Sequence, residues 1–357
     1  MHTMNTKIWL KKIFKKFFHS PTEPLIKIHL HKSALLNNIA EFKRYYPKNI
    51  IAPVLKSNAY GHGLVEIATI LKEYIDMFII DSYHEAEKLR NHGIKNKLLI
   101  IGYVRPECIN NYTLKNISYV ITSIESLKEI KNTANIHLKI DTGMHRQGIS
   151  VEEIDTAFEY IIKNKNINLE GICSHLSDAD NANSNFTIKQ INLWNSIVDK
   201  TRNKFPEIKY IHISNTFGYK YAGKINSNTS RLGIGLYGIV KIDNMNLIPV
   251  LEMKTIITGI KKLKKGDAVG YNNTFIAQNN MKIANIPIGY YEGLDRNLSN
   301  KGFVKIRNTF CPIVGRISMN ISTVDISDID DIKIGECVQV ISNNSNDFNS
   351  IESMAKI

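Results

Sequence analysis

From residue 51 onward, short apolar runs alternate with longer amphipathic segments, and this rhythm limits the folds that the chain can adopt. Short apolar runs bounded by turn residues indicate buried strands, whereas apolar residues recurring every three or four positions indicate helices. We predict eight strands, at 51–55, 76–80, 97–102, 119–121, 136–140, 169–174, 209–213 and 231–236. Amphipathic segments fall between them, at 63–72, 84–91, 123–131, 150–164 and 185–203. An earlier strand at 25–30 and a helix at 31–44 precede this series.

Eight strands separated by helices over roughly 200 residues predict an α/β fold of the (β/α)8 barrel type. A doubly wound open sheet is the alternative, but no G-x-G-x-x-G motif follows the first strand, so the usual phosphate-binding turn is missing. After residue 245 the helical pattern gives way to short alternating stretches broken by Gly, Asn and Asp turns, which indicate a mostly-β domain. The expected domains are an N-terminal extension at 1–24, a barrel at 25–245 and a C-terminal β domain at 246–357.

The composition excludes some classes of partner. The net charge of +13 is spread over a chain rich in Lys, Asn and Ile, and no base-stacking aromatic motif accompanies it, so we expect no nucleic-acid partner. The four cysteines show no C-x-x-C spacing, which argues against a disulfide framework and against a metal site. A cytoplasmic location is the expectation that follows.

The N-terminal extension has a pattern of its own. Residues 7–18 place apolar and aromatic side chains on one helical face and lysines on the other, which is typical of a basic amphipathic helix. Such a helix either makes a weak contact with an anionic membrane surface or docks on its own protein, and both alternatives stay open. No apolar run in the chain approaches the length of a membrane span.

Lys56 directly follows the first strand of the series and is succeeded by small and polar residues and by glycine. The carboxyl ends of barrel strands meet at one face, which is where this fold carries its functional groups. A lysine held partly desolvated there can lose its proton and form a Schiff base with an aldehyde. Any α/β protein has lysines at strand ends, so Lys56 alone does not decide the function.

Further polar residues follow other strands at the same predicted face. They are Tyr60 after the first strand, Lys139 and Arg146 after the fifth, His175 after the sixth, Asn215 and Thr216 after the seventh, and Arg231, Gly233 and Ile234 in the eighth. The Thr216 hydroxyl and the backbone N–H groups of Gly233 and Ile234 would bind a phosphate where barrels favour one. Singly, His175 reads as a core histidine, Arg231 as a structural ion pair and Gly233 as a packing residue. Together with a reactive lysine they indicate pyridoxal 5'-phosphate.

Several motifs, in the same order along the chain, resemble alanine racemases, which are pyridoxal-phosphate isomerases built from a barrel and a β domain. The resemblance runs from about residue 25 to the chain's end. Its motifs lie at 56–63, 138–148, 170–180, 231–238, 269–271, 287–290 and 312–319.

This resemblance implies the interconversion of L- and D-alanine, which supplies D-alanine for peptidoglycan. Racemisation needs a base on each face of a planar carbanion. By similarity, Lys56 is one base and binds the cofactor, and Tyr271 from the partner subunit of a homodimer is the other. His175 and Arg231 would assist Tyr271, and Arg231 would also face the pyridine nitrogen, which a donor-only guanidinium leaves unprotonated.

The resemblance also assigns the remaining residues. Arg146 matches an arginine beside the substrate carboxylate, and Lys139 matches a lysine that can be carbamylated to orient it. Tyr290 and Met319 match the partner subunit's contribution at the substrate entrance. The positions matched on the phosphate side are Tyr60, Asn215, Thr216, Gly233 and Ile234.

Three departures from the family pattern leave alternatives open. Asn320 stands where an aspartate is usual, His145 stands where glycine is commoner, and the family usually continues beyond Ile357 with a segment that narrows substrate access. We therefore expect a truncated β domain. The alternatives to an alanine racemase are a broader or serine-type racemase of the same fold and a noncatalytic cofactor-binding remnant.

Overall fold

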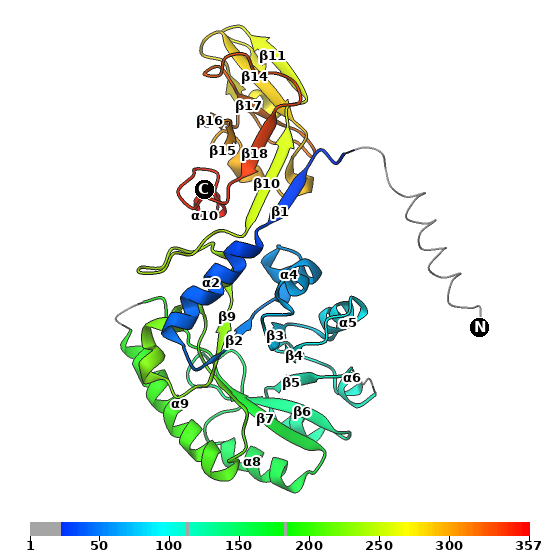
Figure 1. Ribbon diagram of the computed structural model, residues 1–357, viewed down its shortest axis with the longest axis vertical. Coiled ribbons are helices and arrows are strands. Elements are labelled where there is room, and N and C mark those ends of the chain that lie inside the picture. The colour runs from blue at the N-terminus through cyan, green and yellow to red at the C-terminus, as the bar shows by residue number, and fades with distance from the viewer. Residues whose placement is uncertain (1–22, 112–113, 182–183) are drawn as a thin grey trace, which may run out of the picture. The chain divides into compact units, whose positions relative to one another are not determined.

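The computed structural model describes residues 23–111, 114–181 and 184–357 (Figure 1). The amphipathic helix expected at 7–18 lies outside these residues. The chain divides into two compact units. One comprises Leu30–Leu251 with Asn343–Ser345, and the other comprises the described residues up to His29 together with Glu252–Ser342 and Asn346–Ile357.

The first unit contains eight parallel strands at the positions that the alternating pattern predicts. Six of them, β3 to β8, form one sheet in sequence order, and β2 pairs with β9. The strands are β2 (Ile50–Pro53), β3 (Met77–Ile80), β4 (Lys97–Ile100), β5 (Ile117–Ile121), β6 (Ala134–Lys139), β7 (Ile167–Cys173), β8 (Tyr210–His212) and β9 (Thr229–Leu232).

Backbone contacts close these strands into a ring. A parallel bridge between Val54 and Ile79 joins β2 to β3. The Arg231 N–H donates to the Ser214 carbonyl at 3.3 Å, which joins β9 to the end of β8. The predicted (β/α)8 barrel is therefore confirmed. The eighth strand ends at Leu232 and not at residue 236, because the backbone leaves the extended conformation at Gly233 and a 3₁₀ helix, η2 (Ile234–Tyr237), follows.

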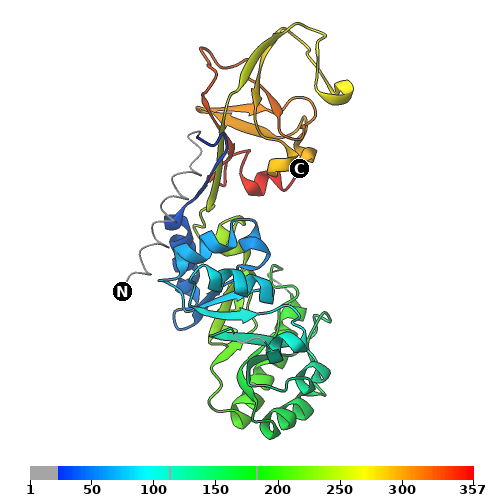
Figure 2. The ribbon, with the colours of Figure 1, turned by 90° about the vertical axis from the view of Figure 1, so that its right-hand side faces the viewer.

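Helices lie on the outside of the barrel strands, as the blue-to-green part of Figures 1 and 2 shows. They are α2 (Lys32–Tyr45), α4 (Leu64–Leu71), α5 (Tyr83–Asn91), α6 (Pro106–Asn111), α7 (Ile124–Lys128), α8 (Ile154–Lys163), α9 (Asn185–Lys204) and the 3₁₀ helix η1 (Thr216–Lys224). Serine side chains begin three of them, since Ser82, Ser123 and Ser184 each accept the N–H of the residue three positions later. We predicted no helix at α6, which has only six residues.

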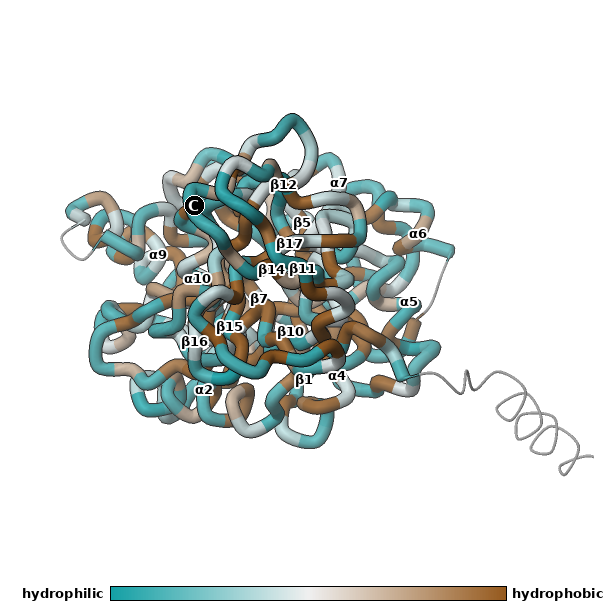
Figure 3. The backbone as a smooth tube through the Cα atoms, turned by 90° about the horizontal axis from the view of Figure 1, so that it is seen from above, coloured by the Kyte–Doolittle hydropathy of each residue, from teal (hydrophilic) through white to brown (hydrophobic). Residues whose placement is uncertain are grey.

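Apolar side chains fill the layer between the strands and the helices, with Phe78, Phe158 and Trp194 among the largest fully buried ones. A smaller apolar cluster comes from alternate positions on β2 to β5 and β7: Ala52, Val54, Met77, Ile79, Leu99, Val120 and Cys173. In Figure 3 the loops at the outer edge of the view are mostly hydrophilic. Because strand side chains alternate in direction, the two clusters mark the outer and inner faces of the barrel wall.

The second unit is built mainly of antiparallel strands, as the turn-rich sequence after residue 245 predicts. A five-stranded sheet runs in the order β1 (Lys27–Leu30), β10 (Leu251–Ile256), β18 (Cys337–Ile341), β15 (Phe303–Ile306) and β16 (Thr309–Pro312). The strand expected at 25–30 thus pairs with β10. A three-stranded sheet contains β11 (Gly259–Leu263), β14 (Met281–Ile286) and β17 (Ser322–Asp325).

Short elements complete this unit. They are the hairpin pair β12 (Ala268–Val269) and β13 (Phe275–Ile276), the 3₁₀ helices η3 (Tyr271–Asn273), η4 (Tyr290–Glu292) and η5 (Arg296–Leu298), and α10 (Ile351–Met354). In the parts of the chain that the structure describes, none of the helices has the length and apolar character that crossing a bilayer requires.

Candidate active site

A cavity of about 610 Å³ opens at the carboxyl ends of the barrel strands. Every strand of the ring contributes to its lining from its last residues or from the residues that follow it. These lining residues include Val54, Asp81, Ile101, Val120, Lys139, Cys173, His212 and Arg231. This is the face at which barrels of this type carry their functional groups.

Ten of the site residues predicted from the sequence line this one cavity: Lys56, Tyr60, Lys139, Arg146, His175, Asn215, Thr216, Arg231, Gly233 and Ile234. The other three lie in the β unit. There the side chains of Tyr271, Tyr290 and Met319 are on the surface, with exposed fractions of 64%, 43% and 54%.

A left-handed turn, α3 (Lys56–Tyr60), places Lys56 and Tyr60 on the cavity wall. The four residues from Ser57 to Tyr60 have φ values of 56°, 54°, 54° and 55°. Left-handed backbone costs roughly 1–2 kcal/mol for each L-residue, so neighbouring contacts must hold the turn. The Glu85 carboxylate accepts the Ser57 N–H at 2.9 Å, and the Asn58 side chain accepts the Leu64 N–H at 3.0 Å.

Three residues converge on one side of the cavity, where the sequence predicts a phosphate site. A Cβ atom at Gly233 would lie 3.0 Å from the Tyr60 hydroxyl and 3.8 Å from the Thr216 hydroxyl. Thr216 Oγ1 accepts the Gly235 N–H at 3.2 Å, which leaves its own hydroxyl hydrogen to donate. Burial raises the pKa of Tyr60, which keeps its hydroxyl a donor.

Arg231 forms the floor of the cavity. Its Nη1 atom lies 2.6 Å from Nδ1 of His212, and its Nη2 atom lies 2.9 Å from Nδ1 of His175. The guanidinium also donates to the carbonyl oxygens of Ser174, His212 and Ile213. The residue is only 8% exposed, and among the described residues no carboxylate pairs with it, so neutral acceptors alone satisfy the buried cation.

The guanidinium determines which nitrogen of His175 carries the proton. Arginine can only donate, so Nδ1 of His175 must accept and the ring proton must be on Nε2. Burial, followed by the charge of Arg231, lowers the pKa of His175 to about 2. His175 is therefore a neutral ring whose remaining N–H group is free to act as a donor toward a ligand.

His212 is a lining residue that the sequence analysis missed. The same argument makes it neutral, because burial and the charge of Arg231 lower its pKa well below the usual value. The sequence does carry a signal for it, because a polar residue stands in an apolar strand. His212 lies between Ile211 and Ile213, at an inward-facing position where an apolar residue is expected.

The opposite wall is cationic. Lys139 Nζ lies 3.5 Å from Oε1 of Gln147, and burial is the main cause that lowers the pKa of Lys139. Arg146 is exposed beside them. The lining has four cationic side chains, Lys56, Lys139, Arg146 and Arg231. Its single carboxylate is that of Asp81, so the cavity favours anionic ligands.

The donor set of the lining shows what kinds of ligand the cavity suits. In the described stretches, no group of three or more His, Cys, Asp or Glu side chains is arranged to hold a metal ion. The cavity offers a primary amine, neutral donors around Gly233 and a donor-only guanidinium. These groups fit a phosphorylated pyridine aldehyde, because the amine can condense with an aldehyde, while the neutral donors and the guanidinium can donate to a phosphate and to a pyridine nitrogen.

Comparisons with known proteins agree with this geometry. Residues 30–241 match the family model of the alanine racemase N-terminal domain, and residues 250–357 match that of the alanine racemase C-terminal domain. The alanine racemase of Fusobacterium nucleatum subsp. nucleatum is 37% identical over 325 residues, which cover 88% of this chain and 90% of that protein. The alanine racemase of Methanococcus maripaludis is 33% identical, with 90% of each chain covered.

Solved structures give the same result. The alanine racemase of Clostridium difficile 630 superposes with a TM-score of 0.84 at 29% identity, covering 94% of this chain and 90% of that one. A histidine racemase of Leuconostoc mesenteroides subsp. sake superposes with a TM-score of 0.83 at 26% identity, covering 95% of this chain and 94% of the other. Both domain models and the close relatives together show that the chain belongs to the alanine racemase family.

Proposed function

We propose that this protein is a pyridoxal-phosphate-dependent racemase that interconverts L- and D-alanine with two bases, Lys56 and Tyr271. The observation that carries the proposal is the meeting of Lys56, the donors around Gly233 and the Arg231 guanidinium in one cavity. The product D-alanine would serve peptidoglycan synthesis, and we place the enzyme in the cytoplasm.

We assign eight of the lining residues to the cofactor site: Lys56, Tyr60, His175, Asn215, Thr216, Arg231, Gly233 and Ile234. Lys56 would bind it covalently through its amine, and Tyr60, Asn215, Thr216, Gly233 and Ile234 would hold the phosphate. Arg231 would donate to the pyridine nitrogen and keep it unprotonated, because a guanidinium does not give up its proton. When bound, the cofactor supplies the electron sink that makes the α-proton of an amino acid removable.

The chain's own residues would then move the protons. Lys56 takes or returns the α-proton on one face, and the Tyr271 phenol does so on the other. A phenol needs stabilisation of its charged form to act as a base near neutral pH. The Nε2–H group of His175, whose position Arg231 determines, is the donor that would provide it.

The substrate carboxylate would bind at the cationic wall. Arg146 can donate two parallel N–H groups to a carboxylate, and Lys139 lies beside it on the same wall. Gln147, which contacts Lys139 at 3.5 Å, offers an amide oxygen that holds the lysine as a donor. Carbamylation of Lys139, implied by the family resemblance, would instead give Arg146 an anionic partner.

A homodimer would bring Tyr271, Tyr290 and Met319 of one subunit to the cavity of the other. All three side chains are exposed on the β unit. Backbone hydrogen bonds from Tyr290 to Ser318 and from Tyr291 to Met319 hold two of these segments side by side. A surface with several exposed aromatic side chains is typical of a subunit interface.

The test is racemisation of L- and D-alanine by wild-type protein and by Tyr271→Phe, with bound cofactor followed by its visible absorbance. We expect Tyr271→Phe to bind the cofactor and to lose turnover in both directions, because one of the two bases is gone. Tyr291→Phe is the matched control, since Tyr291 is exposed on the same unit and has no assigned role. Unchanged turnover in Tyr271→Phe would exclude the two-base assignment.

A broader racemase is the second candidate. The structural likeness to a histidine racemase and the replacement of an aspartate by Asn320 both favour testing it. Asn320 has no charge where the family usually has an aspartate, and its side-chain amide donates to the Glu292 carboxylate at 2.6 Å. Racemisation rates for alanine, serine and histidine decide between the candidates. Cofactor binding without turnover of any amino acid would favour a noncatalytic remnant.

A further inference from the structure

The interior of the barrel is polar on one side. β2 to β5 direct mainly apolar side chains inward, as barrels of this type generally do, with Lys97 and Ser118 as buried polar exceptions. In contrast, β6, β8 and β9 place His137, His212 and Arg231 at interior positions, and all three are buried. Only Arg231 and His212 line the cavity, so His137 lies beneath the site and outside the residues assigned to it.

The neighbouring strand is shaped to admit the His137 ring. A register shift between Ile136 and His137 makes Glu170 an extra residue on β7, which is a β-bulge. At the next position, a Cβ on Gly171 would lie 2.8 Å from Nδ1 of His137 and 2.7 Å from the Tyr210 carbonyl. Gly171 therefore leaves the space that the imidazole occupies.

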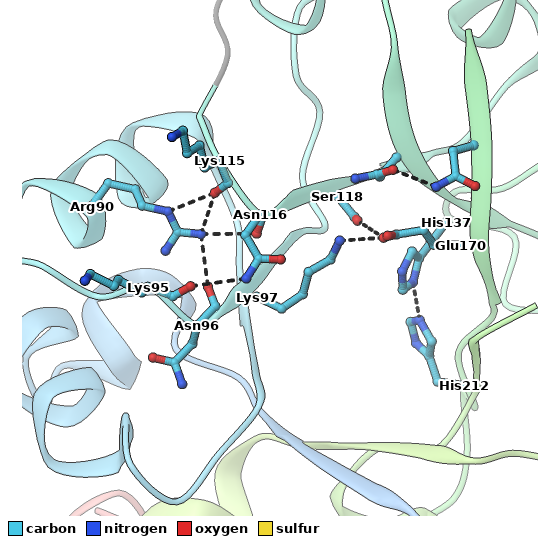
Figure 4. Close-up of polar contacts among 12 residues, drawn as sticks. Arg90, Lys95, Asn96, Lys97, Lys115, Asn116, Ser118, His137, Glu170 and His212 are labelled. Carbon is cyan, nitrogen blue, oxygen red and sulfur yellow. Dashed lines mark hydrogen bonds and ion pairs between the residues drawn. The ribbon is translucent and has the colours of Figure 1, made fainter. Parts of the chain in front are cut away.

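Hydrogen-bonding rules assign the ring protons of the two histidines that are linked to Arg231. Arg231 donates to Nδ1 of His212, so His212 must carry its proton on Nε2. That Nε2 lies 2.8 Å from Nδ1 of His137, which must accept and so carries its own proton on Nε2. Figure 4 shows the two rings joined in this way, with Lys97 and Ser118 reaching toward Glu170 beside them. Arg231 therefore donates to His212, and His212 in turn donates to His137.

Packing alone does not account for a histidine at position 137. Its Nε2 atom is buried, and it has no hydrogen-bond partner among the described residues. A buried N–H group without a protein partner is no reason for choosing histidine over an apolar ring, so the hydrogen bond to His212 is the contact that distinguishes histidine here. Burial and the charges of Lys97 and Arg231 lower its pKa to about 3, which keeps the ring neutral. A phenyl ring could fill the same space, but it has no atom that could accept the hydrogen bond from His212.

We propose that His137 is a positioning residue of the active site, which orients His212 and through it the Arg231 guanidinium that faces the cofactor and His175. This inference rests on the proposed function, because it concerns the cofactor-facing side of Arg231. It adds a residue that touches neither cofactor nor substrate. Its role is to hold His212 in the tautomer and ring orientation that accept from Arg231.

The first test reads the tautomers directly. Long-range nitrogen–proton NMR correlations of the protein carrying isotope-labelled histidine distinguish a proton on Nδ1 from one on Nε2. We expect the His212 and His137 signals, identified by their loss in single variants, to be those of neutral rings protonated on Nε2 between pH 6 and 9. A proton on Nδ1 of His212, or a charged ring, would overturn the proposal. This experiment does not require racemase activity, so it stands even if the proposed function fails.

The second test uses two variants at position 137. His137→Phe keeps a ring beside Tyr210 but removes the acceptor, whereas His137→Asn keeps an acceptor oxygen near the place of Nδ1. Loss of one such hydrogen bond is expected to lower kcat roughly three- to tenfold in His137→Phe, with KM for alanine little changed. The His212 signal should shift in the same variant. His137→Asn should restore both the rate and the signal.

Ser118→Ala serves as the control, because Ser118 is buried in the same interior but bonds to Glu170 and not to the histidines. It should leave the His212 signal and kcat unchanged. If His137→Phe keeps the wild-type rate and the wild-type His212 signal, the proposal is wrong. It is equally wrong if the Phe and Asn variants lose activity alike with an unchanged His212 signal, since that pattern indicates a structural role only.

Discussion

The Nη2 atom of Arg231 lies 2.9 Å from Nδ1 of His175. The contact joins a buried cation to a ring that must stay neutral to accept from it. With His212 bonded to the same guanidinium and His137 bonded to His212, three linked histidines are neutral. Burial and the nearby positive charge both oppose a second cation.

These histidines predict that the protein loses stability in mild acid. Their pKa values in the folded state are lowered, to about 2 for His175, to about 3 for His137 and well below normal for His212. In the unfolded chain they titrate near pH 6.5. Above that pH both states are neutral. Below it only the unfolded state takes up protons, so the free energy of unfolding falls by up to about 1.4 kcal/mol per pH unit for each ring.

Urea unfolding between pH 5 and 8 measures this dependence. The three rings together predict a slope of up to about 4 kcal/mol per pH unit below the histidine range. His137→Asn should reduce that slope by about a third, because one titrating ring is removed. Equal slopes for wild type and His137→Asn would contradict the prediction.

The left-handed turn after Lys56 predicts a role for Glu85. Its carboxylate accepts the Ser57 N–H at 2.9 Å and the Asp81 N–H at 2.7 Å, so it holds the turn against its unfavourable backbone conformation. Glu85→Gln removes the charge and turns one acceptor into a donor. We expect a loss of about 1.5–3 kcal/mol in the free energy of unfolding and a lower racemisation rate, because Lys56 is less well placed.

Glu87→Gln provides the comparison for this variant. Glu87 is exposed on the same helix, and its change should stay within about 0.5 kcal/mol of wild type. The measurements are urea unfolding and alanine racemisation of both variants. A Glu85→Gln protein with wild-type stability would show that the turn is held by its other contacts.

The repeating part of the fold could be predicted from the sequence, because its signal is periodic. Buried strands such as Met77–Ile80 and Lys97–Ile100 are short apolar runs, and their parallel order follows from the helices between them. The end of the eighth strand could not be placed, since Leu232 to Leu236 stays apolar while the backbone turns at Gly233. A change of backbone direction without a change of polarity leaves no periodic signal.

The site was predictable where strands deliver residues to one face and where motifs resemble a known family. The left-handed turn at Ser57 to Tyr60 was not, because neither alanine nor tyrosine favours that conformation and the stabilising Glu85 lies far along the chain. His137 and His212 were missed because a histidine in an apolar strand reads as a core residue. Their importance emerges only from the hydrogen bonds that connect them to Arg231.

The buried ion pair between Lys97 and Glu170 predicts a large effect on stability. Lys97 Nζ lies 2.5 Å from Glu170 Oε2, both side chains are about 10% exposed, and Ser118 donates to the same oxygen. Glu170→Gln leaves the lysine charge buried without a counter-charge, so we expect a loss of about 3–5 kcal/mol. Adding Lys97→Met should recover most of it, as measured by urea unfolding. A double variant less stable than Glu170→Gln would contradict this account.

The closeness of Gly233 to Tyr60 predicts coupled effects on cofactor binding. An added Cβ at Gly233 would lie 3.0 Å from the Tyr60 hydroxyl and would push it out of place. If that hydroxyl donates to the cofactor phosphate, Gly233→Ala and Tyr60→Phe should each weaken cofactor binding about tenfold, and the double variant should be little worse than either. Gly223→Ala is the control, because a Cβ there meets nothing within 4 Å. Cofactor titration followed by absorbance gives the dissociation constants. Losses that simply add in the double variant would show that Gly233 acts on the cofactor independently of Tyr60.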